Sequence, residues 1–259
     1  MDAVDAILRA PAARAFLQLI RDGDLALDDA LEVPRVFELA GFAVGEVSPW
    51  RADHAEVPAR PPALEVRRFA EDVAVHPLWL KLFEPLDLDA QEWLSEAGPT
   101  RFSDIAGAPS QWERYAEKPA TRPFTSTVRA GTSSLRVSME NRVNDWPGFK
   151  GEPDIRHAIV EPSVRVFEVC GPADWHALCA LGGARDDSPN PFPGRMVPDW
   201  SKVAESWDAV HMTLGGVLTS TQVRAGTEEA WSFMWAWDCE CTLWLRDRLV
   251  FEEVPARSP

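Results

Sequence analysis

Two carboxylates near the C-terminus are the best placed residues of this chain to do chemistry. Asp238 and Glu240 stand two residues apart at the start of an apolar stretch, inside a tryptophan-rich segment that runs from Trp231 to Leu245. In an extended strand, residues i and i+2 point to the same face. Burying a carboxylate among aromatic side chains costs free energy unless a partner or a substrate uses its charge. The pair therefore either flanks a substrate or forms the ion-paired edge of a strand.

Hydroxyl side chains give a second candidate segment, which reads Phe124-Thr-Ser-Thr-Val128. If this segment is a strand, Thr125 and Thr127 share one face and Ser126 points to the other. A β-strand with one polar face is the simpler interpretation, because threonine favours strands. The functional interpretation is a row of hydroxyl groups that holds a site.

Cysteines and histidines give a third candidate, a zinc site. Cys170, His176 and Cys179 follow a C-x5-H-x2-C spacing, and zinc accepts both residue types. The compact pair of cysteines typical of a zinc knuckle is missing, so we favour buried structural cysteines and expect no metal. For His211 we favour a structural histidine within a strand over a general base.

The carboxylate pair and the hydroxyl strand together resemble the mono-ADP-ribosyltransferase superfamily. An aromatic-Ser/Thr-Ser/Thr strand is followed far downstream by an acidic-x-Glu segment that opens a hydrophobic strand. The resemblance covers about residues 120–250 and includes two intervening segments, Pro162–Val169 with the helix after Asp174, and Trp207–His211.

The resemblance implies a specific reaction. NAD, as substrate, would bind in the cleft of a split β-sheet, and its nicotinamide–ribose bond would break through an oxocarbenium-like transition state. Glu240 would hydrogen-bond a ribose hydroxyl and stabilise the developing positive charge, which works best in a dry, preorganised site. Ser126 and Thr127 would hold the cleft and orient this glutamate. Asp238 stands where many relatives carry Glu or Gln to handle the acceptor.

The resemblance also implies an Arg or His on an early strand that grips NAD. Arg67 or Arg68, on a strand expected over residues 63–69, is the best match. His76 is a rival for the same role.

The elements that must position these residues divide into a helical beginning and a sheet. Four prolines between Ser48 and Pro62 indicate a stiff linker. We therefore predict a helical N-terminal unit (1–47), a Pro-rich linker (48–62) and an α+β, ADP-ribosyltransferase-like domain with a split β-sheet (63–259).

Hydrophobic periodicity and Gly, Pro and cap positions predict the individual elements. The expected helices are a first one ending at Gly23, then one from Leu27, one from Pro34 to Gly41, two pieces within 70–96, and 111–118, 174–181 and 200–207. The expected strands are 63–69, 124–128, 134–138, 157–160, 164–169, 209–214, 217–223, 242–245 and 249–254, with a hairpin turn at Gly215-Gly216.

Composition limits the partners. The formal net charge of −15 argues against a nucleic-acid backbone as the main partner. The absence of a long apolar run, the acidic N-terminus and the cysteine spacing predict a cytoplasmic protein without a membrane span. The twelve tryptophans either fill the core or provide a stacking surface for nicotinamide or a nucleoside.

The leading hypothesis is a bacterial cytoplasmic enzyme that transfers ADP-ribose from NAD to a protein or another macromolecular acceptor, or that hydrolyses NAD. The alternative is a non-enzymatic acidic interaction module, such as an antitoxin, an immunity protein or an adaptor.

Overall fold

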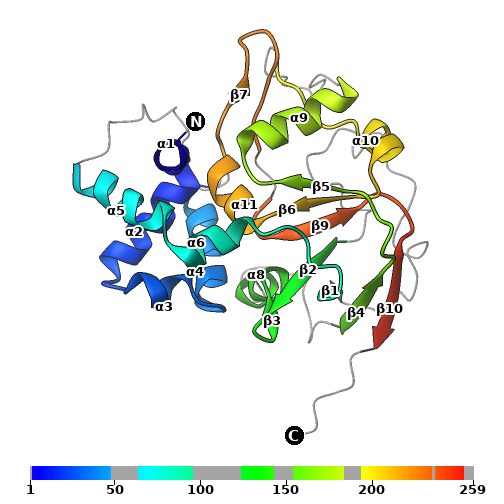
Figure 1. Cartoon of the computed structure of the whole chain (residues 1–259), viewed down its shortest axis with the longest axis horizontal. Coiled ribbons are helices and arrows are strands. Elements are labelled where there is room, and N and C mark those ends of the chain that lie inside the picture. The colour runs from blue at the N-terminus through cyan, green and yellow to red at the C-terminus, as the bar shows by residue number, and fades with distance from the viewer. Residues whose placement is uncertain are drawn as a thin grey trace, which may run out of the picture.

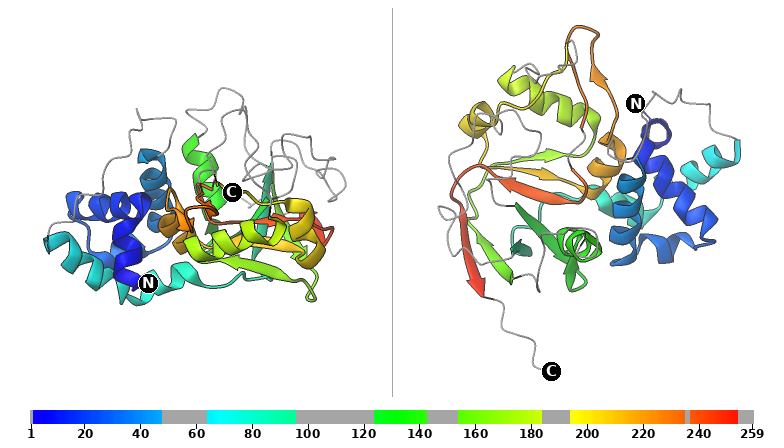
Figure 2. Two further views of the ribbon diagram at one scale, coloured as in Figure 1. Left: turned by 90° about the horizontal axis from the view of Figure 1, so that it is seen from above. Right: turned by 180° about the vertical axis from the view of Figure 1, so that it is seen from behind.

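The fold is mixed α and β, in a computed structural model that describes residues 2–47, 64–95, 124–142, 154–183, 194–234 and 237–253. Figure 1 shows the N-terminal helices gathered on one side of the molecule and the sheet on the other. Figure 2 shows the same arrangement from two further directions. The α+β class predicted from the sequence is confirmed. The predicted linker (48–62) and helix 111–118 lie outside the described residues.

Short helices form the N-terminal side. They are α1 (Ala3–Arg9), α2 (Pro11–Asp22), α3 (Leu27–Leu31), α4 (Arg35–Glu46), α5 (Leu64–Ala74), α6 (Pro77–Leu80) and the 3-10 turn η1 (Lys81–Phe83). The expected single first helix is divided because Pro11, which lacks an N–H, begins a new helix. Gly23 ends α2 as predicted, whereas α4 continues past Gly41.

Helix α5 corrects the strand predicted over residues 63–69. Val66, Phe69, Ala70 and Val73 all pack against the N-terminal hydrophobic cluster. Their spacing of three and four residues is that of a helix with one apolar face. The seven residues of the predicted strand were too few to distinguish this helical pattern from that of a strand. Arg67 and Arg68 therefore lie on a helix and not on the expected early strand.

One sheet contains most strands of the described chain. Its order is β10 (Leu249–Glu253), β4 (Asp154–Val160), β1 (Gln91–Ser95), β2 (Phe124–Arg129), β9 (Cys241–Trp244), β6 (Ala209–Met212) and β5 (Val166–Val169), with β3 (Thr132–Ser133) paired to β2. Neighbours in this order are antiparallel except β5 and β6, which are parallel. The crossover between these two strands contains α9 (Pro172–Gly182) and α10 (Trp200–Ser206). A separate hairpin pairs β7 (Ala225–Gly226) with β8 (Trp231–Ser232).

The centre of the sheet is joined by a short junction. Strands β2 and β9 pair only at Phe124–Leu243 and Thr125–Thr242. Beyond these two pairs, β2 continues beside β1, whereas the chain before β9 turns into the loop that carries Glu240. A split sheet was expected, and the described strands instead form one connected path that narrows at this junction.

Two further elements differ from the sequence predictions. Residues 134–138, expected as a strand, begin helix α8 (Ser134–Arg142), and residues 91–95, expected within a helix, form β1. The side chain of Ser133 accepts a hydrogen bond from the N–H of Arg136 at 3.2 Å, as an N-cap does. This cap starts the helix despite the β-branched Val137, which is buried.

Helix α11 (Leu214–Ser220) replaces the predicted hairpin turn and strand 217–223. Thr213 caps it by accepting the N–H of Gly216 at 2.9 Å. Both glycines allow close packing: a Cβ on Gly215 would lie 2.4 Å from the ring of Phe83, and one on Gly216 would lie 2.2 Å from the carbonyl oxygen of Val169. Leu214 and Leu218 then enter the N-terminal cluster. Close backbone approach, and not a turn, explains the Gly-Gly pair.

A Gly216→Ala substitution is therefore expected to lower the free energy of unfolding by about 1–3 kcal/mol, because the added methyl group meets main-chain atoms that cannot move aside. Gly41→Ala is the matched control. A Cβ there meets nothing within 4 Å, and alanine favours a helix interior, so this variant should gain about 0.5–1 kcal/mol. Urea denaturation of both variants measures the difference, and equal stabilities would contradict the packing argument.

The remaining predictions agree with the structure. Strands 124–128, 157–160, 164–169, 209–214, 242–245 and 249–254 and helices 174–181 and 200–207 all occur, with ends shifted by a few residues. Ala12 and Val44 of the N-terminal helices pack in the same cluster as Val169 and Leu243 of the sheet. The two sides of the molecule thus share apolar contacts, while the domain boundaries drawn from the sequence stay predictions.

Candidate active site

Glu240 occupies the gap that opens beside the junction of the sheet. It is only 4% exposed. The hydroxyl of Ser126 donates a short hydrogen bond to its Oε2, and the N–H of Thr127 donates to its Oε1 at 3.2 Å. On β2, Thr127 lies beyond the two residues that pair with β9, and the Glu240 carboxylate accepts its N–H in place of a strand.

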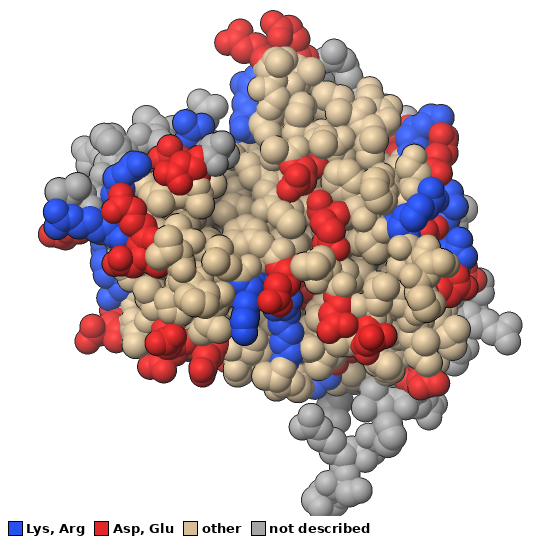
Figure 3. All heavy atoms as spheres, in the orientation of Figure 1, with Lys and Arg blue, Asp and Glu red and all other residues tan. Residues whose placement is uncertain are grey.

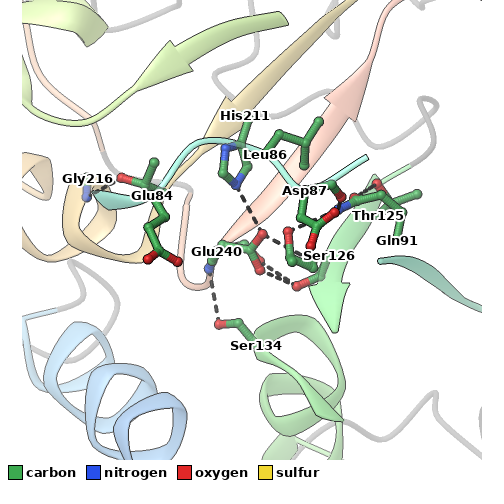
Figure 4. Close-up of polar contacts among 12 residues, drawn as sticks. Glu84, Leu86, Asp87, Gln91, Thr125, Ser126, Ser134, His211, Gly216 and Glu240 are labelled. Carbon is green, nitrogen blue, oxygen red and sulfur yellow. Dashed lines mark hydrogen bonds and ion pairs between the residues drawn. The ribbon is translucent and has the colours of Figure 1, made fainter. Parts of the chain in front are cut away.

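Helix α8 fixes the same site from above the sheet. The N–H of Glu240 donates to Ser134 Oγ at 3.1 Å, and the N–H of Leu135 donates to Ser126 Oγ at 3.3 Å. Figure 4 shows the Glu240 carboxylate between Ser126 and His211, with Ser134 on the side of the helix. The first turn of α8 thus contacts both members of the Ser126–Glu240 pair.

His211 completes the environment of Glu240. Its Nε2 lies 3.1 Å from Glu240 Oε1, and its Nδ1 lies 2.5 Å from Glu168 Oε2. Burial by itself would lower the pKa of His211, but the hydrogen bonds and charges of Glu168 and Glu240 outweigh it and raise this pKa to about 9. At neutral pH the imidazole is therefore protonated on both nitrogens, and it lies between the side chains of Glu168 and Glu240.

A second layer of polar groups lies on the other face of β2. Gln91 donates to Thr127 Oγ1 at 3.0 Å and accepts from Thr125 Oγ1 at 2.7 Å, and the indole of Trp244 donates to Thr125 Oγ1 at 2.8 Å. The predicted alternation is confirmed, because Ser126 points to Glu240 while its two neighbours point away. Thr127 contributes to the site through its main-chain N–H and not through its hydroxyl.

A partly buried ion pair holds α8 on the sheet. Glu92, directly opposite Ser126 on β1, is 3% exposed and pairs with Arg136 of α8. The hydroxyl of Ser133 also donates to the Glu92 carboxylate. These contacts fix the helix whose first turn holds Glu240 and Ser126.

A cavity of about 440 Å³ opens next to Glu240 and His211. Its apolar wall comes mostly from the N-terminal side of the molecule. Its charged residues come from both sides: Glu32, Lys81 and Glu84 from the N-terminal side, and Arg129, His211 and Glu240 from the sheet and the loop before β9. The lining residues are Leu31, Glu32, Val33, Val36, Phe37, Leu78, Lys81, Leu82, Glu84, Arg129, Ala130, His211, Thr213, Leu214 and Glu240. The N-terminal helices therefore form part of the site.

Arg129 is a site residue that the sequence analysis missed. It ends β2, and its Nη1 donates to the carbonyl of Lys81 at 3.2 Å and to Glu84 Oε2 at 3.1 Å. The turn that follows, Ala130-Gly131, has positive φ at both residues and returns the chain into β3. The available signal was a cation at the end of the Ser/Thr strand, directly before a tight turn.

The predicted NAD-gripping residues lie elsewhere. Arg67 is exposed on α5 and pairs with Asp5 and Glu71. Arg68 is exposed on the same helix, and His76 caps α6 by accepting the N–H of Leu78. None of the three lines the cavity, and neither does Asp238. The structure therefore brings Glu240, Ser126 and Thr127 together and separates the arginine pair from them.

The cysteines do not form a metal centre in the described part of the chain. No group of three or more His, Cys, Asp or Glu side chains there is arranged to hold a metal ion, and the four cysteines form no disulfide. No helix among the described residues is long and apolar enough to cross a membrane. Comparisons of the chain with family models, with curated proteins and with solved structures find no match.

Proposed function

We propose that this protein cleaves the nicotinamide–ribose bond of NAD and transfers ADP-ribose to a macromolecular acceptor or to water. The observation that carries the proposal is the contact between Ser126 and Glu240, a residue that lines the cavity. These residues are 114 positions apart, and each was singled out from the sequence for this role.

The carboxylate of Glu240 suits the charge that the reaction develops. When the C1′–N bond breaks, its electron pair stays on the nicotinamide nitrogen and positive charge grows on the ribose. A preorganised negative group in a site shielded from water stabilises this charge strongly. Oε1 already accepts from Thr127 and His211, whereas Oε2 accepts from Ser126 alone among these donors. One acceptor position of Oε2 therefore stays available for a ribose hydroxyl.

Cations line the same cavity and suit the diphosphate of NAD. Arg129 and Lys81 both face it, together with Glu32 and Glu84. A guanidinium binds phosphate oxygens through paired, charge-assisted hydrogen bonds. The site thus has a carboxylate for the ribose, and its two cations could contact the diphosphate once Arg129 exchanges its partner Glu84 for a phosphate oxygen. In this proposal Arg129 takes the role that the sequence gave to Arg67 or Arg68.

The direct test combines binding and chemistry on the whole chain. NAD should raise the melting temperature, and incubation with NAD should release free nicotinamide, which chromatography separates from NAD. A parallel incubation with radiolabelled NAD and a protein extract separates transfer to a macromolecule from hydrolysis. No thermal shift together with no nicotinamide would refute the proposal.

Replacing Arg129 with Gln is expected to raise the KM for NAD about 10- to 100-fold and to change kcat little. The lost interaction is a charged hydrogen bond made in the ground state and the transition state alike. Arg68→Gln removes the same charge from an exposed position on α5 and should leave both constants unchanged. Steady-state kinetics of the two variants decides between the sequence-based and the structure-based assignment, and a larger KM for Arg68→Gln would reverse it.

A non-enzymatic interaction protein is the second candidate. The observation that favours it is that Ser126, Thr127 and His211 already bind the Glu240 carboxylate, as they would in a purely structural site. On the face shown in Figure 3, however, the acidic side chains are scattered and do not gather into one docking patch. A partner that co-purifies at fixed stoichiometry, combined with an absence of nicotinamide release, would support this second candidate.

A further inference from the structure

Glu168 is a site group that the reaction described above does not use. In the parallel pairing of β5 and β6, Glu168 stands directly opposite His211. In the antiparallel pairing of β6 and β9, His211 stands opposite Thr242, two residues after Glu240. Glu168 and His211 are therefore neighbours in a row across the sheet, and this row leads to Glu240.

Burial changes steeply along this row. The side chain of Glu168 is 28% exposed, that of His211 is 1% exposed and that of Glu240 is 6% exposed. The N–H of Leu86 donates to Glu168 Oε1 at 3.0 Å and leaves Oε2 to His211. A half-buried carboxylate, itself held by the backbone, thus anchors an imidazole that is almost completely removed from water.

We infer that Glu168 is a positioning residue that acts through His211, holding the imidazole in its charged form and aiming its Nε2–H at Glu240. The inference rests on the proposed cleavage of NAD, because Glu240 is the group it serves. A charged imidazole donates from both ring nitrogens, whereas a neutral one donates from one nitrogen only. With both protons present, Oε1 of Glu240 is fixed between His211 and Thr127, and Oε2 stays directed toward Ser126 and the substrate.

The surroundings of His211 agree with this role. Glu168 and Glu240 contact it directly, and the cavity that it lines also holds Glu32, Glu84, Lys81 and Arg129. Glu84 and Arg129 pair with one another. The two direct carboxylates oppose the effect of burial on the pKa of His211, so removing either one favours the neutral ring.

Glu168→Gln tests the inference, since glutamine keeps an oxygen for the N–H of Leu86 and places a neutral NH2 group where the charged oxygen accepts from His211 Nδ1. We expect the alkaline limb of the kcat/KM profile for NAD to move at least one pH unit lower. At pH 9 kcat should fall at least about fivefold, while KM stays within about twofold of the wild type. Glu168→Asp restores the charge and should return the limb toward its wild-type position. Glu205→Gln, on the exposed face of α10, is the control for an unrelated loss of charge.

A second readout needs no activity. The ring nitrogens of His211, followed by ¹⁵N NMR in the NAD-free protein, should titrate at least one pH unit lower in Glu168→Gln than in the wild type. If the wild type releases no nicotinamide, the proposed function fails and the titration alone decides this inference. The inference would be overturned, with the proposed function intact, if the wild type is active and Glu168→Gln changes neither the pH profile nor the titration of His211. Should Glu168→Gln not fold, the wild type alone decides: a His211 ring that titrates near the ordinary value of 6.5 in the NAD-free protein would overturn the inference.

Discussion

Replacing Glu240 with Gln should reduce the rate of nicotinamide release by about 100- to 1000-fold, which is the cost of removing one preorganised charge-stabilising group from a dry active site. Gln has nearly the same shape, so the cavity keeps its size. Its amide is neutral, however, and cannot stabilise positive charge on the ribose. The loss should appear in kcat more than in KM, because the charge interacts most strongly with the transition state.

The hydrogen bonds of Glu240 also predict how the Gln substitution affects the stability of the protein. One carboxylate oxygen faces donors from Thr127 and His211, and the other faces the Ser126 hydroxyl. The glutamine side chain has one oxygen and one NH2 group, so the NH2 group takes the place of one carboxylate oxygen. It then faces either the donors from Thr127 and His211, or Ser126, whose hydroxyl can turn to accept a hydrogen bond from it. Some loss of stability is therefore expected, and circular dichroism and NAD-induced thermal shift must accompany the kinetics.

Glu205→Gln is the matched control for this experiment, because it makes the same chemical change on an exposed side chain that pairs with Lys202. It should leave nicotinamide release unchanged. A folded Glu240→Gln protein with wild-type activity would remove Glu240 from the mechanism. The tryptophans between Trp231 and Leu245 would then be interpreted only as core residues.

The second large effect is a loss of stability at alkaline pH. The pKa of His211 is raised to about 9 in the folded protein, from an ordinary value near 6.5. A raised pKa means that the folded state binds the proton more tightly, so the stabilisation is complete below pH 6.5 and is lost as the pH rises through 9. The corresponding fall in the free energy of unfolding is on the order of 3 kcal/mol between pH 6.5 and 9.

Urea denaturation at several pH values between 6 and 9.5 measures this change. His211→Gln removes the imidazole and with it the contribution of its proton to the free energy of unfolding. The free energy of unfolding of this variant should therefore change less with pH between 6.5 and 9 than that of the wild type. His157→Gln is the matched control, since His157 is a half-buried histidine on β4 whose ring contacts the carbonyl of Asp89. Parallel slopes for wild type and His211→Gln would show that the imidazole is not held as a cation between Glu168 and Glu240.

Local patterns in the sequence determined several features of this protein. The alternation of β2 placed Ser126 opposite in direction to Thr125 and Thr127, because the strand period of two depends only on the backbone. The side chain of Asp199 caps α10 by accepting the N–H groups of residues two and three positions later, so this helix start depends only on neighbours in the chain. The acidic residue that opens β9 could likewise be recognised from its neighbours in the chain.

Tertiary structure alone decided the rest. Helices α5 and α11 lie in short apolar segments whose pattern fits either a helix or a strand, and packing against Phe83, Val169 and the N-terminal cluster selected the helix. The roles of Glu168, His211 and Arg129 depend on strand order and register. Those are set by contacts between residues tens of positions apart, and no local pattern encodes them. The sequence alone could therefore nominate Glu240 and Ser126, but only the fold could show which cations and which histidine surround them.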